Sequence, residues 1–293
     1  MRRLITILNL SRPIYILLAA LTYFLGAAVA RYLGHPPVLR TFWLGFTGMV
    51  LAQMRMSLLV EVFRPINEPI LRDESISERL VLHDAALYLS VGGLAAMAVI
   101  AFFLFKDSQL ARPVWLYLGL SLIVIFLYSV PPFRLVDKGY GETFLAIHLG
   151  FLIPSISFLL QSVSYHRLLY ATLLPLTFLS LASILIYDFP GFADDLKYGR
   201  QNLLVRLGWE RAIPLHQGIV IFAYILFGLG PLYGFSLGLI WPAFLTVPFA
   251  LLQIFWLRNI SFGAKPIWSV LTANSVAIFG LTAYFLTLTF WLH

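Results

Sequence analysis

Two aspartates and several basic residues follow one another at the end of a long apolar stretch. Asp188 ends the apolar run, and Asp195 comes seven residues later, which places both on one face if a helix continues through them. Carboxylates with this spacing can share a hard divalent cation such as Mg²⁺, which also binds phosphate oxygens. Lys197, Arg200 and Arg206 follow directly as candidate phosphate partners. The segment therefore predicts either a metal and phosphate site or a solvated, charged loop.

The rest of the chain is strongly apolar. Of its 293 residues, 60% are hydrophobic and 11% are charged, and the mean hydropathy is +0.89. Apolar runs of about 17 to 25 residues recur along the chain, and each is long enough to cross a hydrocarbon core about 30 Å thick. We expect one integral membrane domain over residues 1–293, an all-α polytopic bundle of about nine transmembrane helices around a cavity that opens to the cytoplasmic side. The spans are predicted at residues 13–33, 42–62, 84–105, 114–130, 143–163, 168–188, 214–234, 236–256 and 268–292.

The basic residues predict the orientation of this bundle. With nine spans, one side of the membrane holds Arg31, Arg40, Lys106, Arg112 and Arg167, Arg55 lies within a span, and the other 14 Lys and Arg residues lie on the opposite side. Cytoplasmic loops carry the excess of Lys and Arg. We therefore expect the amino terminus in the cytoplasm and the carboxyl terminus outside, in a prokaryotic plasma membrane.

The acidic residues are distributed even more unevenly than the basic ones. Of 13 Asp and Glu residues, only Asp107 falls on the predicted outer side. Acidic residues contribute little to membrane topology, so the positive-inside rule does not require this asymmetry. Either the three cytoplasmic loops that hold the acids are simply the large ones, or they build a site.

Two classes of function are excluded or disfavoured by composition. The chain has no cysteine, so disulfides, thiolate catalysis and cysteine metal sites are excluded. Its net charge is +7, but the basic residues lie in short loops between apolar spans, where they set orientation and meet anionic lipid. We expect membrane lipids as partners and no nucleic acid.

Several motifs together resemble those of the UbiA superfamily of intramembrane prenyltransferases. The match to its second aspartate-rich motif consists of Asp188-Phe189-Pro190, Asp194-Asp195, Lys197, Gly199-Arg200 and Val205-Arg206-Leu207-Gly208. Tyr128-Ser129-Val130-Pro131-Pro132 resembles its Tyr-Ser-Pro-Pro loop, and Ile66-Asn67-Glu68-Pro69 resembles the segment after its first aspartate-rich motif. Weaker matches to the menaquinone-type and chlorophyll-synthase-type members are Gly139-Tyr140-Gly141-Glu142, Arg12-Pro13 and Leu25-Gly26.

The resemblance implies a prenyl diphosphate held by Mg²⁺ between two aspartate-rich loops. The diphosphate ionises to an allylic cation, which alkylates a hydrophobic acceptor that is aromatic or a quinone or pigment precursor. The departing diphosphate needs concentrated positive charge from metal and basic side chains. The implied catalytic residues are Asp188, Asp195 and Tyr128. The implied metal ligands are Asp188, Asp194, Asp195, Glu61 and Glu68, and the implied diphosphate partners are Arg64, Arg72, Arg134, Lys138, Lys197 and Arg200.

The first aspartate-rich motif is degenerate in this chain. The positions of its Asn and Asp ligands are occupied by Met56, Ser57, Val60 and Arg64, and Gly191 replaces the middle acid of the second motif. Loss of even indirect metal partners weakens a site roughly 10–100-fold, so we expect weakened Mg²⁺ binding. Arg64 places a fixed cation where a carboxylate and Mg²⁺ are expected, which favours diphosphate binding over catalysis.

Alternatives stay open for individual residues. Glu61 either belongs to the site or pairs with Arg64 or Arg55. Tyr128 either contacts substrate or anchors the interface. Arg134 and Lys138 either bind phosphate or only follow the positive-inside rule, and His148 is expected to be an interhelical hydrogen-bonding residue.

Alternatives also stay open for the whole protein. A degenerate relative would bind a prenyl lipid, quinone or pigment, or act as an accessory subunit of a larger membrane-protein complex. Transport is less favoured, because the chain shows no inverted repeat.

Overall fold

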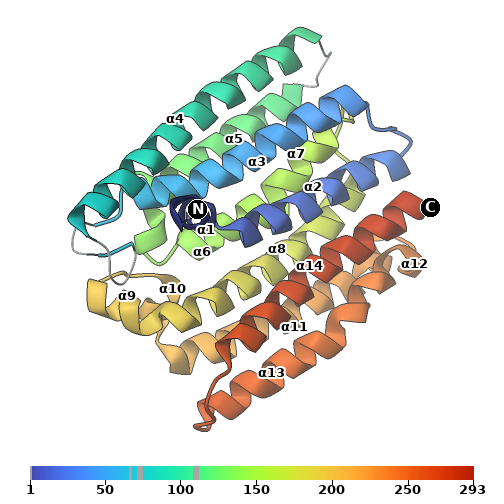
Figure 1. Ribbon diagram of the computed structural model, residues 1–293. Helices are drawn as coiled ribbons and strands as arrows, with labels where there is room; N and C mark the ends of the chain where they lie inside the picture. The colour runs from blue at the N-terminus through green and yellow to red at the C-terminus, as the bar shows by residue number, and fades with distance from the viewer. Residues whose placement is uncertain (1, 66–67, 71–74, 108–111) are drawn as a thin grey trace.

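The computed structural model describes residues 2–65, 68–70, 75–107 and 112–293, and within these ranges the chain is helical and has no strand (Figure 1). Eight segments are long and apolar enough to cross a membrane: Pro13–Tyr32, Leu39–Val62, Ile76–Lys106, Gly141–Leu159, Arg167–Tyr198, Trp209–Gly228, Leu237–Ser261 and Trp268–Leu292. A further apolar helix, Pro113–Ser129, is shorter. The all-α membrane bundle predicted from the sequence is confirmed.

The helices run in the following order along the chain. The first half contains α1 (Arg2–Leu10), α2 (Pro13–Tyr32), α3 (Leu39–Val62), α4 (Ile76–Asp107), α5 (Arg112–Ser129), η1 (Leu135–Asp137), α6 (Gly141–Ile147), η2 (His148–Leu152) and α7 (Ile153–Leu159). The second half contains α8 (Arg167–Asp188), η3 (Phe189–Gly191), α9 (Phe192–Tyr198), α10 (Leu203–Leu207), α11 (Trp209–Gly228), η4 (Gly230–Tyr233), α12 (Leu237–Ile240), η5 (Trp241–Thr246), α13 (Val247–Ser261) and α14 (Trp268–Leu292).

The helix α1 precedes the first predicted span and was not predicted. Arg12 adopts a left-handed backbone conformation with φ of 51°, and Pro13 is the first residue of α2, so the chain breaks between the two helices. The short α1 packs against α3 and α4. This break brings Arg12 to the end of the bundle, where the charged segments lie.

Two of the predicted spans are interrupted helices. The span predicted at 143–163 consists of α6, the π-helical turn η2 and α7, and the span predicted at 236–256 consists of α12, the 3₁₀ turn η5 and α13. Apolar side chains continue through both interruptions, so hydropathy alone does not reveal them. π-helical turns occur frequently at functional sites.

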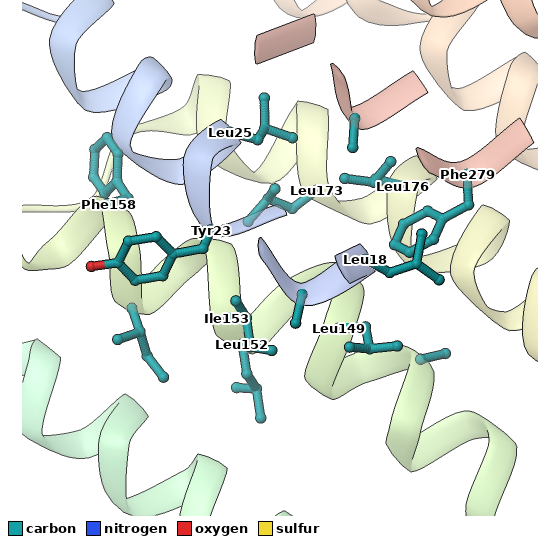
Figure 2. Close-up of a cluster of buried hydrophobic side chains, with 14 of the residues drawn as sticks. Leu18, Tyr23, Leu25, Leu149, Leu152, Ile153, Phe158, Leu173, Leu176 and Phe279 are labelled. Atoms are coloured by element: carbon teal, nitrogen blue, oxygen red, sulfur yellow. The ribbon is translucent and has the colours of Figure 1, made fainter. Parts of the chain in front are cut away.

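The helix α2 forms the centre of the bundle. It packs against α3, α7 and α14, and its buried residues Leu18, Tyr23 and Leu25 meet side chains of η2, α7, α8 and α14 (Figure 2). By contrast, α4 and α13 are peripheral, because most of their residues face outward. The inner helices therefore fix the ends of α3 and α8, where the charged residues gather.

The charged segments lie together at one end of the bundle. In Figure 1, α9, α10, the end of α3 and the start of α4 lie at this end, and the carboxyl terminus and α12 lie at the other. Of the acidic residues that the sequence placed on one side, Glu61, Glu68 and Asp195 are linked through arginines, and Glu142, Asp188 and Asp195 line one cavity.

Close packing between α2 and α7 generates a prediction. A Cβ added at Gly26 would lie 2.0 Å from the carbonyl oxygen of Pro154, so Gly26→Ala forces the two backbones apart. We expect destabilisation of about 1–3 kcal/mol, seen as a lower thermal unfolding temperature in detergent. Gly218→Ala in α11 is the matched control, since no atom lies within 4 Å of its added Cβ. Equal unfolding temperatures for the two variants would contradict the packing described here.

Candidate functional site

A single carboxylate joins the two halves of the charged end. Arg200 Nε donates to Glu68 Oε2 at 2.9 Å, and both Arg200 and Arg64 donate to Glu68 Oε1. Glu68 is 6% exposed, so these pairs are largely withdrawn from water. We call this arrangement of Arg64, Glu68 and Arg200 the Glu68 bridge. It links the end of α3 to the turn after α9 across 132 positions of sequence.

The ion pairs extend in both directions from the Glu68 bridge. Arg64 Nε donates to Glu61 Oε2 at 2.7 Å, and Arg12 lies 4.0 Å from the other oxygen of Glu61. On the other side, Arg200 lies 3.7 Å from Asp195 Oδ1. The arginines of this network and its carboxylates are equal in number, so their formal charges cancel.

The path of the chain through α8, η3 and α9 positions the two aspartates of the second motif. The chain continues from Asp188 through the single turn η3 into α9. This continuation was the condition under which Asp188 and Asp195 were predicted to share one face. Gly199 then adopts a left-handed conformation with φ of 74° and ends α9. The turn allows the Arg200 amide to donate to the Asp195 carbonyl at 2.9 Å, which directs Arg200 back toward the site.

Asn202 holds Asp195 from the other side. Its Nδ2 donates to Asp195 Oδ2 at 2.6 Å, and its Oδ1 accepts the Val205 amide at 2.8 Å at the start of α10. Asn202 thus caps a helix and orients an acid at once. The Leu203 amide donates to Glu142 Oε1 at 2.7 Å, which ties α6 to the same turn.

A small cavity of about 50 Å³ is lined by three acids that are not part of the Glu68 bridge. We call it the acidic chamber; its lining includes Glu142, Asp188, Asp195 and Tyr128. The side chains of Glu142 and Asp188 contact each other, and Glu142 Oε2 and Asp188 Oδ2 are buried without a hydrogen-bond partner. The chamber therefore holds carboxylate oxygens that still need a proton or a cation.

Arg12 supplies the positive charge beside the acidic chamber. Burial lowers the pKa of Arg12, whereas Tyr128, Tyr15, Glu61 and Asp188 raise it, and the net effect is a raised pKa. Burial likewise lowers the pKa of Arg200 and Glu68 raises it, again with a net rise. Both guanidinium groups therefore stay charged at every physiological pH.

A wider cleft of about 620 Å³ lies next to the acidic chamber. We call it the charged cleft; it is lined by Arg64, Glu68, Pro69, Ile70, Asp194, Asp195, Lys197 and Tyr198. Asp195 lines both spaces. The charged cleft has the volume of an ordinary small-molecule site, whereas the acidic chamber has room only for water or an ion.

The donor atoms fit Mg²⁺ on one side of the site only. Asp188 and Glu142 offer unpaired carboxylate oxygens, which are the ligands Mg²⁺ prefers. Glu61 and Glu68 are already bound by guanidinium groups. Among the described residues, no ready group of three His, Asp or Glu side chains is arranged to hold a metal. Mg²⁺ bound here would need water or phosphate oxygens to complete its coordination.

The other implied residues are placed as follows. Tyr128 lines the acidic chamber, and Asp194 and Lys197 line the charged cleft. Arg134 pairs with Asp137 and donates to the Val60 carbonyl, and Lys138 donates to the Pro132 carbonyl, so neither has a contact that directs it into these two spaces. Arg72, Ile66 and Asn67 lie outside the described residues.

The positions that should hold the first-motif ligands are packed into the bundle instead. Met56, Ser57 and Val60 are each 3% exposed or less, and Ser57 Oγ donates to the carbonyl of Gln53 at 3.2 Å. Arg64 alone of these positions reaches the charged cleft. The first half of the site therefore presents a guanidinium group where the resemblance implies carboxylates.

Four residues of the site were not assigned to it from the sequence. They are Arg12, Tyr15, Glu142 and Asn202. The Arg12-Pro13 and Gly139-Tyr140-Gly141-Glu142 motifs carried a signal for two of them. Tyr15 and Asn202 had no sequence signal. Tyrosines are common in apolar spans, and asparagines are common in loops.

Comparisons with known proteins support the fold. No protein-family model and no curated protein matches the chain. Among solved structures, a UbiA homologue from Archaeoglobus fulgidus is 19% identical with a TM-score of 0.61, covering 97% of this chain and 99% of that one. The A. fulgidus homologue bound to GPP and Mg²⁺ is also 19% identical, with a TM-score of 0.54 and coverage of 96% and 99%. A UbiA homologue from Aeropyrum pernix K1 is 14% identical, with a TM-score of 0.53 and coverage of 94% and 96%. At these identities the likeness establishes that the chain has the UbiA fold.

Removing the charge of Glu68 tests the importance of the Glu68 bridge. Glu68→Gln leaves Arg64 and Arg200 close together without their shared carboxylate, and breaking a buried ion cluster costs about 3–5 kcal/mol. We expect a clear fall in thermal unfolding temperature in detergent. Glu210→Gln removes an exposed carboxylate at the start of α11 and is the matched control. A Glu68→Gln protein as stable as this control would show that the bridge does not hold the two halves together.

Proposed function

We propose that this protein belongs to the UbiA superfamily, in its menaquinone-type and chlorophyll-synthase-type branch, and transfers a prenyl group from a prenyl diphosphate to an aromatic acceptor or a quinone or pigment precursor. The observation that carries the proposal is the joining of residues 61–65, 68–70 and 188–202 into one charged site at the end of an apolar bundle. A prenyl diphosphate likewise has a charged end and an apolar part: an anionic diphosphate and an apolar chain.

The charged cleft provides groups for the diphosphate. Arg64, Arg200 and Lys197 lie in or beside it, and guanidinium groups bind phosphate oxygens through paired hydrogen bonds. The formal charge of the Glu68 bridge and its neighbours is zero, so a diphosphate needs further positive charge. Lys197 is one source. Mg²⁺ is the other: Asp188, Asp195 and Glu142 would hold it, and it would neutralise charge on the leaving diphosphate.

The reaction needs a proton acceptor as well as an anion site. When the bond between the prenyl carbon and the diphosphate oxygen breaks, the diphosphate leaves with the bonding electrons, and an aromatic carbon of the acceptor forms the new bond. That carbon must then lose its proton. The carboxylates of Glu142 and Asp188 line the adjoining acidic chamber and could accept it through a water held in that chamber. Tyr128 lines the same chamber.

A second candidate function is a degenerate relative that binds a prenyl lipid, quinone or pigment without turnover, or serves as a subunit of a membrane complex. The observation that favours it is the pairing of Arg64 and Arg200 with Glu68, which leaves these cations partly satisfied before any substrate arrives. Buried Met56 and Val60 in the first motif favour it further.

A single-turnover assay separates the two functions. Purified protein is mixed with radiolabelled farnesyl or geranylgeranyl diphosphate, Mg²⁺ and a panel of aromatic and quinol acceptors. For a transferase we expect diphosphate release and a prenylated product, both lost in Asp188→Asn. Arg200→Ala should weaken diphosphate binding about 10-fold or more, because hydrogen bonds to charged groups contribute roughly 1.5–3 kcal/mol. Glu210→Gln should match the unmodified protein.

Each outcome of that assay has a defined meaning. Saturable binding without diphosphate release supports the degenerate relative. Absence of both binding and release contradicts the transferase. Full activity in Asp188→Asn contradicts the assignment of Asp188 to the site.

The orientation of the protein in a prokaryotic plasma membrane is a separate part of the proposal. The chain has no native cysteine, so a single introduced cysteine reports its own accessibility. We expect Lys265→Cys, between α13 and α14, to react with a membrane-impermeant maleimide only from the cytoplasmic side. Gly34→Cys, between α2 and α3, should react only from outside. The reverse labelling pattern would contradict the positive-inside assignment.

A further inference from the structure

A second, apolar cavity lies away from the charged site. Its volume is about 320 Å³, and residues of α3, α4, α5 and α7 line it together with His148 of η2. The helix α4 packs mainly on α3. We call this space the His148 cavity; none of the residues that line the acidic chamber or the charged cleft lines it.

The polar end of the His148 cavity is a hydrogen-bonded chain of three buried side chains. His148 Nδ1 lies 3.2 Å from Gln53 Oε1, and His148 Nε2 lies 2.9 Å from Ser121 Oγ. Because Gln53 Oε1 can only accept, His148 carries its hydrogen on Nδ1, and Ser121 must donate to Nε2. Ser121 and His148 line the cavity. The prediction that His148 forms interhelical hydrogen bonds is confirmed.

This chain of side chains has unused hydrogen-bonding capacity. Ser121 Oγ has donated its hydrogen and keeps lone pairs that accept a hydrogen from another hydroxyl. Gln53 is 1% exposed, and its Nε2 has no hydrogen-bond partner. Gln53 does not line the cavity, so the capacity that faces the cavity is that of Ser121 Oγ. Because His148 carries its hydrogen on Nδ1, Ser121 Oγ is left as a hydrogen-bond acceptor. A ligand that contacts Ser121 must therefore donate a hydrogen bond.

Charge and shape restrict the ligand further. The described residues that line the cavity include no Lys, Arg, Asp or Glu, so neither a phosphate nor a carboxylate would be stabilised there. The lining part of α4 extends from Leu94 to Leu104, about 15 Å along the helix, which is half of a hydrocarbon core about 30 Å thick. Met49 and Met97 provide flexible walls. The space suits one extended apolar chain.

We propose that the His148 cavity binds one uncharged lipid that carries a terminal hydroxyl group on a single long chain, as in a prenyl or alkyl alcohol. The hydroxyl donates to Ser121 Oγ in the interior of the membrane, and the chain extends between α4 and α5 toward Trp115. This proposal does not depend on the transferase activity.

Trp115 provides a direct readout because it lines the cavity. The protein, reconstituted in lipid nanodiscs, is titrated with a long-chain alcohol that ends in bromine, which quenches tryptophan fluorescence on contact. A bromoalkane of the same length without the hydroxyl is the matched probe. We expect saturable quenching by the bromo-alcohol, lost in Trp115→Phe, and about 10-fold weaker binding of the bromoalkane, because one hydrogen bond is missing.

Three variants give the structural test. Ser121→Ala should weaken bromo-alcohol binding about 10-fold and leave bromoalkane binding unchanged. Gly119→Leu should abolish saturable quenching, because its side chain enters open space in the cavity. Gly92→Leu, whose side chain also enters open space but on the exposed surface of α4, should bind like the unmodified protein.

The proposal is overturned by either of two results. One is quenching that rises linearly in all variants, which indicates only partition into the bilayer. The other is equal affinity for the bromo-alcohol and the bromoalkane in the unmodified protein. The comparison of the two probes uses only the unmodified protein, so it remains valid even if Ser121→Ala fails to fold. Farnesyl diphosphate binding by Gly119→Leu reports separately on the charged site, so failure of one proposal is distinguishable from failure of the other.

Discussion

Glu68, shared between the guanidinium groups of Arg64 and Arg200, is the interaction on which the charged end of this protein depends. It connects the end of α3 to the turn after α9, two segments that no helix joins directly. Charge-assisted hydrogen bonds of this kind are about twice as strong as neutral ones. Because Arg200 also approaches Asp195, the bridge fixes one boundary of both the acidic chamber and the charged cleft.

The same bridge gives the two halves of the site different chemistry. In the first half, Glu61 and Glu68 serve as counter-ions of arginines, and the remaining first-motif positions are buried in the bundle. In the second half, Asp188 and Glu142 keep unpaired oxygens that a proton or a cation can satisfy. A diphosphate in the charged cleft would meet the guanidinium group of Arg64, whereas the free carboxylates of Asp188 and Glu142 line the adjoining acidic chamber. This asymmetry follows from the guanidinium group of Arg64, which pairs with both Glu61 and Glu68.

The sequence predicted the features that depend on local pattern. Apolar runs predicted the membrane bundle, and the seven-residue spacing predicted that Asp188 and Asp195 share one face if the helix continues. The chain does continue through η3 into α9, and both aspartates line the acidic chamber. Features that depend on tertiary contact were not predictable. Nothing in the neighbourhood of Glu68 indicates that its partner is Arg200, which follows 132 positions later. Asn202 gave no signal either, because its role comes from a turn that Gly199 makes possible.

The interruptions of the helices show a second limit of sequence pattern. Residues 141–159 are mostly apolar, so hydropathy predicts one helix, but the backbone adopts a π-helical turn at His148. The turn accompanies the hydrogen bonds of His148 to Gln53 and Ser121, both on other helices. Partners on other helices are invisible to a periodicity argument. A lone histidine in an apolar run identified the place, but not the cavity beside it.

We propose that residues 61–65, 68–70 and 188–202 form one binding site for the diphosphate end of a prenyl diphosphate. The most direct test of this claim is to map where a farnesyl diphosphate analogue, with a photoreactive group next to the diphosphate, cross-links to the purified protein in the presence of Mg²⁺. The account predicts cross-linked peptides from both segments, suppressed by excess inorganic diphosphate. Cross-links confined to the lipid-facing helices α4 and α13, or insensitive to inorganic diphosphate, would contradict it.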